Sequence, residues 1–281
     1  MSSIPIPNVV VRKPADYKSD LKPIWCPGCG DFAVLAAMQQ ALAALQIDPK
    51  DLAIVSGIGC SSRLPGFLQS YGLHTVHGRS LPAAQGIKLA RPDLTVMAVG
   101  GDGDYFSIGA GHLPHAFRRD INITCIVMDN EIYGLTKGQT SPTSPHGHVT
   151  KSTPMGNPAF PLHPLALAIS SGATYVARGF SSQPKQLAEL IRKGMEHQGF
   201  SFIQAMSPCV TFYDTYKIYK EKVYQIPADH DPHDREAAMR YAMEADRMPL
   251  GLIYQSAPAE RPAPVEPKAF DTLAYLARYQ A

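Results

Sequence analysis

The chain has 281 residues, of which 45% are hydrophobic and 18% charged, and its formal net charge is +2. This size fits one large α/β domain or two small ones, with a sizeable core. The balanced charge gives no sign of the clustered basic face that nucleic-acid binding needs, and no apolar run approaches the roughly 20 residues of a membrane span. The first residues lack the apolar segment of a secretory signal, so we expect a cytoplasmic protein.

The predicted elements alternate between short apolar runs and helical patterns as far as residue 208. The predicted strands are 52–59, 73–78, 94–104, 121–130, 174–180 and 201–208. The predicted helices are 31–45, 81–90, 105–120, 164–172 and 184–197, with Pro114 interrupting the third. This alternation predicts an α/β fold with a doubly wound, mostly parallel sheet.

The pattern divides the chain into three parts. Residues 1–25 hold four prolines and are predicted to form an irregular extension, and residues 26–212 form the core domain. Within that domain, 140–164 hold six prolines, which indicates a long functional loop. Residues 213–281 are polar, with a Pro-rich stretch near the end, and we expect a helical arm that packs on the core or on a partner.

The most informative motif is GDGD, at the end of the predicted strand 94–104. In open parallel sheets, ligands bind beyond the carboxyl ends of the strands. Gly101 and Gly103 allow close approach of the backbone to a phosphate, and Asp102 between them suits a hard cation such as Mg²⁺. Alone the motif is weak, because Gly-Asp-Gly is also a common turn.

The next strand strengthens this interpretation because it ends in MDNEIYG. Asn130 and the backbone carbonyl of Ile132 add two oxygen donors at the neighbouring strand end. Asp102 with this following Asn130 resembles the diphosphate-binding signature of thiamine diphosphate enzymes. In that family the aspartate, the asparagine and the carbonyl hold Mg²⁺ on the diphosphate of the cofactor.

The cysteines point to a second site. Cys26 and Cys29 form a C-x₂-C pair before the first helix, and Cys60 and Cys209 each follow a predicted strand end. Four thiolates on one edge suit an iron–sulfur cluster or a structural zinc, which the spacing alone does not separate. Cys125 lies inside an apolar strand and is expected to be a core residue.

These parts together resemble the β subunit of the 2-oxoacid:ferredoxin oxidoreductases. The matching stretches are WCPGCGD, GIGCS, HGR, GDGD, NEIYGLTKGQTSPT and SPC. The version YGLTKGQ-x-SPTS is similar to the 2-oxoglutarate branch, the 2-oxoglutarate synthases. The resemblance implies a [4Fe–4S] cluster on Cys26, Cys29, Cys60 and Cys209, and thiamine diphosphate with Mg²⁺ on Asp102, Asn130 and Ile132.

The resemblance also implies the surroundings of the cofactor and the substrate. Further cofactor-binding residues would be Gly59, His77, Gly101, Gly103, Asp104, Gly134 and Leu135. Arg63 and Lys137 are cations on loops at the same edge, and they are the candidates for binding the carboxylates of a 2-oxoacid. For each residue the alternative is a surface cation paired with an acidic side chain. Lys137 has a further alternative, a contact to the diphosphate.

The implied reaction is the coenzyme A-dependent oxidative decarboxylation of 2-oxoglutarate to succinyl-CoA and CO₂, with reduction of ferredoxin, or its reverse. The pyrimidine-binding domain would belong to an α subunit, or a fused γα subunit, in a dimer of αβ pairs. An external ferredoxin would carry the electrons. The alternatives are a pyruvate or broad-specificity enzyme, a thiamine-dependent lyase without redox chemistry, and a non-catalytic scaffold with a Cys₄ zinc.

Overall fold

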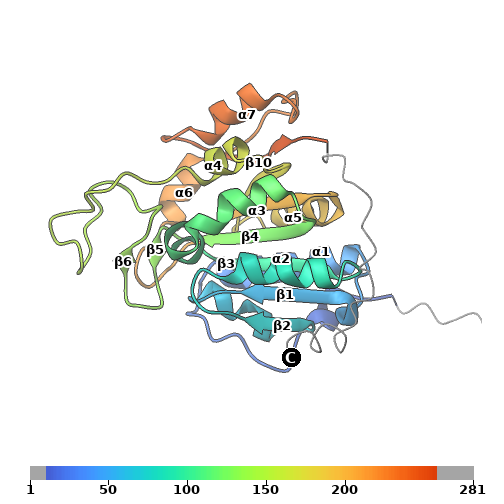
Figure 1. Ribbon diagram of the computed structural model, residues 1–281. Helices are drawn as coiled ribbons and strands as arrows, with labels where there is room; N and C mark the ends of the chain where they lie inside the picture. The colour runs from blue at the N-terminus through green and yellow to red at the C-terminus, as the bar shows by residue number, and fades with distance from the viewer. Residues whose placement is uncertain (1–10, 258–281) are drawn as a thin grey trace, which may run out of the picture.

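The computed structural model describes residues 11–257, which fold around one eight-stranded sheet, and Figure 1 shows how the helices lie around it. The strand order is β2-β1-β3-β4-β8-β7-β10-β9, and every neighbouring pair is parallel except β7 and β10. The strands are β1 Leu52–Ser56, β2 Tyr71–His74, β3 Thr95–Gly101, β4 Ile123–Asp129, β7 Tyr175–Phe180, β8 Phe200–Met206, β9 Val223–Gln225 and β10 Met248–Gln255. A separate hairpin pairs β5 Ile132–Tyr133 with β6 Gln139–Thr140. The doubly wound, mostly parallel sheet predicted from the sequence is confirmed.

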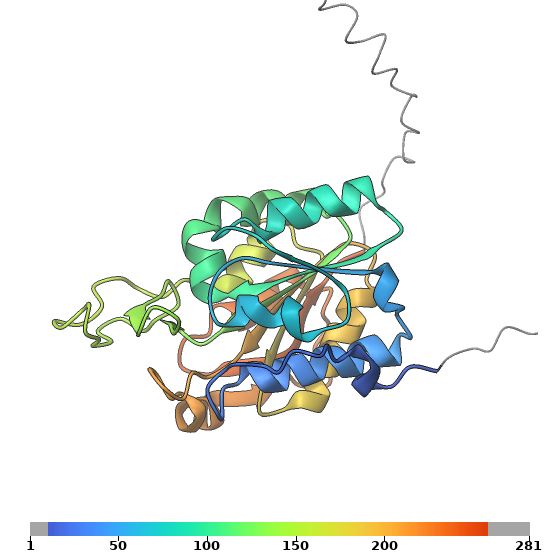
Figure 2. The same cartoon turned by 90° about the horizontal axis from the view of Figure 1, so that it is seen from below.

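Helices cover both faces of the sheet, in two layers with the strands between them (Figure 2). The α-helices are α1 Asp31–Ala44, α2 Ser80–Ala90, α3 Leu113–Arg119, α4 Pro164–Ser170, α5 Pro184–Glu196, α6 Tyr216–Lys222 and α7 Arg235–Ala242. Met38 of α1 and Ile191 of α5 pack with Ile54 on one face, and Val55 on the same strand packs into the opposite core. Because both faces are buried, the central strands are apolar throughout, which is typical of parallel sheets.

The helix predicted over 105–120 is wrong in its first half. A π-helical turn occupies Asp104–Ile108 and a 3₁₀ turn Ala110–His112, so that α3 begins only at Leu113. Pro114 then lies in the first turn of α3, where a missing N–H removes no helical hydrogen bond. The Asp104 side chain at the start of this turn bonds to neighbouring loops, as described below.

The helical arm expected from residue 213 onward is only partly helical. It contains α6 and α7, but β10 adds an antiparallel strand to β7, and β9 pairs with β10 in turn. Pro249 and Gly251 interrupt the apolar pattern of β10, which hid this strand in the sequence. The arm therefore packs on the core as part of its sheet, whereas the boundary at residue 212 stays a prediction.

Two other expectations concern segments at the edges of the fold. The long loop is present: no helix or strand lies between β6 and α4, and the segment projects from the body in Figure 1. The Pro-rich stretch beyond residue 257 lies outside the described residues. Within residues 11–257, no helix has the length and apolar character that crossing a membrane would take.

Candidate functional site

The carboxyl ends of four neighbouring parallel strands, β1, β3, β4 and β8, bring their following loops to one edge of the sheet. Two cavities lie there. A cavity of about 110 Å³, the strand-end cavity, is lined by the loops after β1, β2, β3 and β4. A larger cavity of about 380 Å³, the cysteine cavity, adds the CPGC turn and the loop after β8. The edge is where open α/β sheets bind ligands.

The strand-end cavity brings together all ten residues that the sequence predicted for the cofactor. They are Gly59, His77, Gly101, Asp102, Gly103, Asp104, Asn130, Ile132, Gly134 and Leu135. They come from segments separated by up to about eighty positions in the chain, and only the parallel sheet makes them neighbours.

Asp102 is buried at this cavity next to a second buried carboxylate, Asp129. The hydroxyl of Thr143 lies 3.0 Å from Asp102 Oδ2 and 2.8 Å from Asp129 Oδ1. Burial and the adjacent charge of Asp129 raise the pKa of Asp102 well above its usual range. A buried carboxylate in this state gains most from a nearby cation.

The loop after β4 is shaped by Glu131, which has a positive φ of 58°. A non-glycine residue rarely adopts this left-handed conformation, and it turns the chain sharply. The turn sets Asn130 and Ile132 along the same cavity, and Asn130 Oδ1 accepts a hydrogen bond from the Ile132 N–H at 3.0 Å. Burial raises the pKa of the Glu131 carboxyl to about 8.

Gly103 is required by the close approach of Tyr133. A Cβ at position 103 would lie 2.1 Å from the Tyr133 ring, and the Tyr133 hydroxyl donates to the Gly103 carbonyl at 3.1 Å. The backbone of the GDGD turn therefore packs directly against the Tyr133 ring of the β5–β6 hairpin. We call this contact the floor of the cavity.

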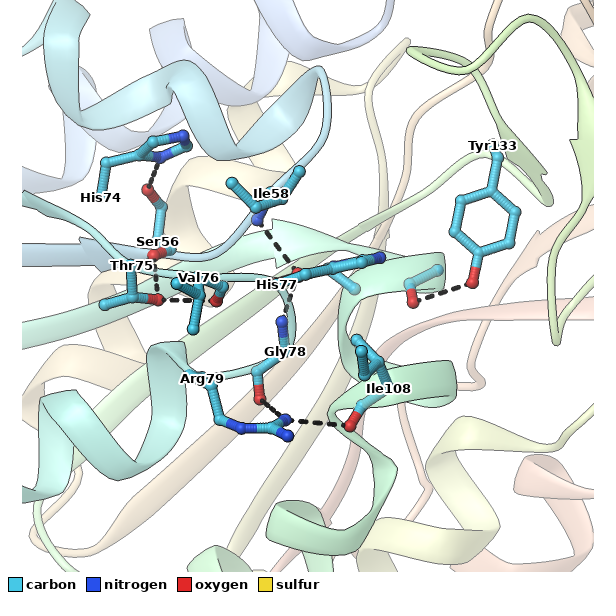
Figure 3. Close-up of polar contacts among 12 residues, drawn as sticks. Ser56, Ile58, His74, Thr75, Val76, His77, Gly78, Arg79, Ile108 and Tyr133 are labelled. Atoms are coloured by element: carbon cyan, nitrogen blue, oxygen red, sulfur yellow. Dashed lines mark hydrogen bonds and ion pairs between the residues drawn. The ribbon is translucent and has the colours of Figure 1, made fainter.

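Asp104 ties two loops together. Its Oδ1 accepts from His77 Nδ1 at 2.5 Å and from the backbone N–H groups of Ile58 and Gly78 at 3.0 and 2.7 Å. In Figure 3 the dashed lines from Ile58 and Gly78 meet at an oxygen atom beside the His77 ring, and the ring extends toward Tyr133. Among the described residues Asp104 Oδ2 has no hydrogen-bond partner. Asp104 thus orients His77 at the cavity.

Four cysteines, Cys26, Cys29, Cys60 and Cys209, line the cysteine cavity. A Cβ at Gly134 would lie 3.6 Å from Cys209 Sγ and 3.7 Å from Cys60 Sγ, so this glycine keeps the backbone beside both sulfurs. Within residues 11–257, no three His, Cys, Asp or Glu side chains are arranged to hold one metal ion. Cys125 is buried in the apolar core of β4, as expected.

A buried carboxylate that the sequence reasoning missed joins the cysteine loops. Asp31, at the start of α1, accepts a hydrogen bond from the Ser207 hydroxyl at 2.6 Å, and the Gly30 N–H donates to the Pro208 carbonyl at 3.1 Å. Burial raises the pKa of Asp31 to about 6. These contacts hold the CPGC turn against the SPC segment that carries Cys209.

Arg63 and Lys137 line the cysteine cavity from two different loops, and both side chains are exposed. Burial raises the pKa of the Cys60 thiol to about 11, and the nearby positive charge of Arg63 opposes this rise. Lys137 has a φ of 83° at the tip of the β5–β6 hairpin. The edge therefore presents two cations to solvent beside the thiols.

Comparison with known families identifies the cofactor domain. Residues 57–205 match the thiamine pyrophosphate enzyme C-terminal TPP binding domain, and residues 209–263 match the C-terminal region of the pyruvate ferredoxin oxidoreductase beta subunit. The 2-oxoacid:ferredoxin oxidoreductase subunit beta of Saccharolobus solfataricus is 45% identical over 83% of this chain and 81% of its own. The chain belongs to the β subunits of the thiamine diphosphate-dependent 2-oxoacid:ferredoxin oxidoreductases.

Relatives of this β subunit have both broad and narrow substrate names. The 2-oxoglutarate oxidoreductase subunit KorB of Mycobacterium tuberculosis is 46% identical over 72% of this chain and 54% of its own. The 2-oxoglutarate:ferredoxin oxidoreductase of Magnetococcus marinus, solved with 2-oxoglutarate, coenzyme A and succinyl-CoA bound, is 46% identical with a TM-score of 0.86. That match covers 95% of this chain and 90% of the solved one.

Sequence reasoning missed the residues that support this β-subunit site from behind. Thr143, Asp129, Gln204 and Arg178 are all buried and reach the strand-end cavity only through side-chain contacts. Thr143 lies inside the SPTS stretch of the matching motif, and that stretch is the one available signal. The other three are single polar residues in apolar strands, which the alternating pattern gives no reason to connect.

Proposed function

We propose that this β subunit acts in the coenzyme A-dependent oxidative decarboxylation of 2-oxoglutarate to succinyl-CoA and CO₂, or in its reverse. Each turnover releases two electrons, which pass singly to two ferredoxins in the cytoplasm. The observation that carries this proposal is that the strand-end and cysteine cavities share Cys60, Asn130, Gly134 and Leu135 in their walls. A carbon-centred reaction and an electron relay then lie side by side.

The donors at the strand-end cavity fit magnesium-bound thiamine diphosphate. A carboxylate, an amide oxygen and a carbonyl are hard ligands of the kind Mg²⁺ prefers, and Asp102, Asn130 and Ile132 offer them at two neighbouring strand ends. When bound, thiamine diphosphate supplies the electron sink for decarboxylation. The chain contributes the rigid floor of Gly103 and Tyr133 and the oriented ring of His77.

The cysteine cavity fits a [4Fe–4S] cluster on Cys26, Cys29, Cys60 and Cys209. Such a cluster binds four thiolates on four different iron atoms, so its ligands surround a volume. The cavity offers about 380 Å³ bordered by these four side chains. Gly134 borders this cavity beside two of the sulfurs, those of Cys60 and Cys209.

The preference for 2-oxoglutarate follows from charge at the rim. This substrate carries two carboxylates, and Arg63 and Lys137 offer two exposed cations beside the shared wall. A guanidinium binds a carboxylate through two parallel hydrogen bonds. The 46% identity to the Magnetococcus marinus enzyme supports the same substrate. A broad 2-oxoacid range remains the second candidate, because relatives with that name are 43–45% identical.

The working enzyme contains an α subunit, or a fused γα subunit, that completes the cofactor site with its pyrimidine-binding domain. Two αβ pairs form the full complex. A β subunit of this family implies such a partner. Ferredoxin is the external acceptor of the electrons that leave the cluster.

The test uses the anaerobically purified αβ complex. We expect a brown protein with equal iron and sulfide, and a higher kcat/KM for 2-oxoglutarate than for pyruvate. Arg63→Ala should lower kcat/KM for 2-oxoglutarate by about tenfold or more, the equivalent of about 1.4 kcal/mol, and leave pyruvate nearly unchanged. Arg91→Ala is the matched control, since Arg91 is an exposed arginine paired with Asp93. A colourless zinc protein, or equal losses for both substrates, contradicts the proposal.

A further inference from the structure

The SPTS stretch, Ser141–Ser144, is buried although it lies in the long loop. Ser141 and Thr143 are each 6% exposed and Ser144 is fully buried. The Ser144 hydroxyl donates to the Glu131 carbonyl at 2.5 Å, and the Asn157 side chain donates to the Ser144 carbonyl at 3.2 Å. The stretch is thus anchored against the loop after β4, at the back of the strand-end cavity.

We propose that Thr143 is a positioning residue for the magnesium ligand Asp102, and that it forms the end of a buried relay through Asp129, Gln204 and Arg178. This inference rests on the proposed magnesium and thiamine diphosphate site, and it gives SPTS a role in holding the cofactor's cation. It differs from the interpretation of this stretch as a mark of substrate preference.

The contacts of Thr143 account for this role. Its hydroxyl is the only group among the described residues that hydrogen-bonds to both carboxylates, at 3.0 Å from Asp102 Oδ2 and 2.8 Å from Asp129 Oδ1. It comes from a loop, whereas the two acids come from the ends of β3 and β4. The hydroxyl has one hydrogen to donate, so it bonds to one carboxyl group at a time while lying within reach of both strand-end acids, and it ties the loop to the ends of β3 and β4.

The relay continues across three neighbouring strands. Gln204 Nε2 donates to Asp129 Oδ2 at 2.7 Å, and Arg178 Nε donates to Gln204 Oε1 at 2.9 Å. Each member is at most 7% exposed. The amide of Gln204 has one orientation available, because one end must donate to a carboxylate and the other must accept from a guanidinium. A fixed guanidinium thus orients Asp129, which in turn orients Thr143.

A direct role in choosing the substrate is disfavoured by the same contacts. The hydroxyl of Thr143 is buried and already engaged with two carboxylates, so it offers no donor to a ligand in the cysteine cavity. Arg63 and Lys137 line that cavity, whereas Thr143 and the other relay residues line a separate cavity of about 190 Å³. Supporting residues behind a metal ligand commonly change metal affinity by 10- to 100-fold when they are removed.

The experiment compares Thr143→Val with Thr143→Ser in the αβ complex. Valine keeps the shape without the hydroxyl, and serine keeps the hydroxyl. We expect Thr143→Val to weaken Mg²⁺-dependent binding of thiamine diphosphate, measured by calorimetry, by about 10- to 100-fold. Thr143→Ser should remain within about threefold of wild type. The absorbance of the cluster and the ratio of kcat/KM for 2-oxoglutarate and pyruvate should stay unchanged.

Two controls separate the possible failures. Thr150→Val, in the same loop but bonded only to Ser152 and Thr153 side chains and local backbone, should bind like wild type. Gln204→Met removes the hydrogen bond to Asp129 and should also weaken Mg²⁺-dependent binding of thiamine diphosphate. This second variant keeps the inference testable if the Thr143→Val protein fails to fold. Wild-type affinity in both variants, or a changed substrate ratio in Thr143→Val, overturns this inference alone. A wild-type complex that binds no thiamine diphosphate with Mg²⁺ overturns the proposed function instead.

Discussion

The strand-end cavity and the cysteine cavity share a wall, yet the protein builds them differently. In the first, Asp102 is 2% exposed and is supported by buried partners that lead back into the sheet. In the second, Cys26 is exposed and Cys29, Cys60 and Cys209 are partly exposed, on three separate segments. One site is held by the sheet behind it, and the other is bordered by loops.

This difference indicates what each site needs from its occupant. In a preorganised site, ordering the side chains that bind the cofactor costs little free energy. Loops that carry thiols are ordered by the metal itself, and in such sites metal binding is partly folding free energy. We therefore expect the cysteine cavity to lose more of its order than the strand-end cavity when each is emptied, although the Asp31–Ser207 bond still holds the CPGC turn against the SPC segment.

The largest expected effect comes from removing one cysteine of the cavity. Cys209→Ala should abolish ferredoxin reduction and the absorbance near 400 nm, because three thiols do not retain the cluster stably. Thiamine diphosphate should still bind to the αβ complex, since Asp102 and its supports are untouched. Cys125→Ala is the matched control: it removes a buried core thiol and should keep the cluster. Equal iron content in Cys209→Ala and wild type would remove this assignment.

The reciprocal change at the strand-end cavity is Asp102→Ala. We expect activity to fall on the order of 10³-fold, because the metal that anchors the diphosphate contributes several kcal/mol. The cluster absorbance should remain. Ferredoxin-reduction assays with 2-oxoglutarate measure the first effect and anaerobic spectroscopy the second. If Asp102→Ala lost both thiamine diphosphate binding and the cluster absorbance, the structures of the two cavities would depend on each other.

The sequence was sufficient to predict the positions of residues that follow from strand direction and short sequence spacing. The carboxyl ends of parallel strands meet at one edge, so Asp102 and Asn130 were predictable neighbours, and the C-x₂-C pair lies on one turn. The supports were not predictable, because the contacts from Thr143 to Asp102 and from Gln204 to Asp129 span 41 and 75 positions. The helix predicted over 105–120 was wrong in its first half. There the Asp104 side chain accepts hydrogen bonds from Ile58 and Gly78, 46 and 26 positions upstream, which local spacing does not reveal.

A smaller effect is expected from Gly103→Ala, which tests how rigid the strand-end cavity is. The new Cβ would lie 2.1 Å from the Tyr133 ring, and overpacking of this kind costs about 1–3 kcal/mol. Both the thermal midpoint and the affinity for thiamine diphosphate should fall. Gly111→Ala is the control, since nothing lies within 4 Å of its added Cβ. Equal thermal midpoints and equal affinities in the two variants would mean that the Gly103–Tyr133 contact adjusts to an added methyl group at little cost.

The smallest effect concerns Trp25, whose indole N–H donates to the Cys60 carbonyl at 2.7 Å and whose ring packs edge-on against Phe32 and Phe67. Trp25→Phe keeps an aromatic ring and removes that hydrogen bond, which contributes about 0.5–1.5 kcal/mol to stability. With the cluster bound, Cys60 is also held by iron, so the loss should be near the lower end. In cluster-free protein the indole is a principal anchor of the Cys60 backbone, and the loss should be near the upper end. Denaturant unfolding of both forms measures this difference, and an equal loss in the two forms would contradict the view that the cluster orders its own cavity.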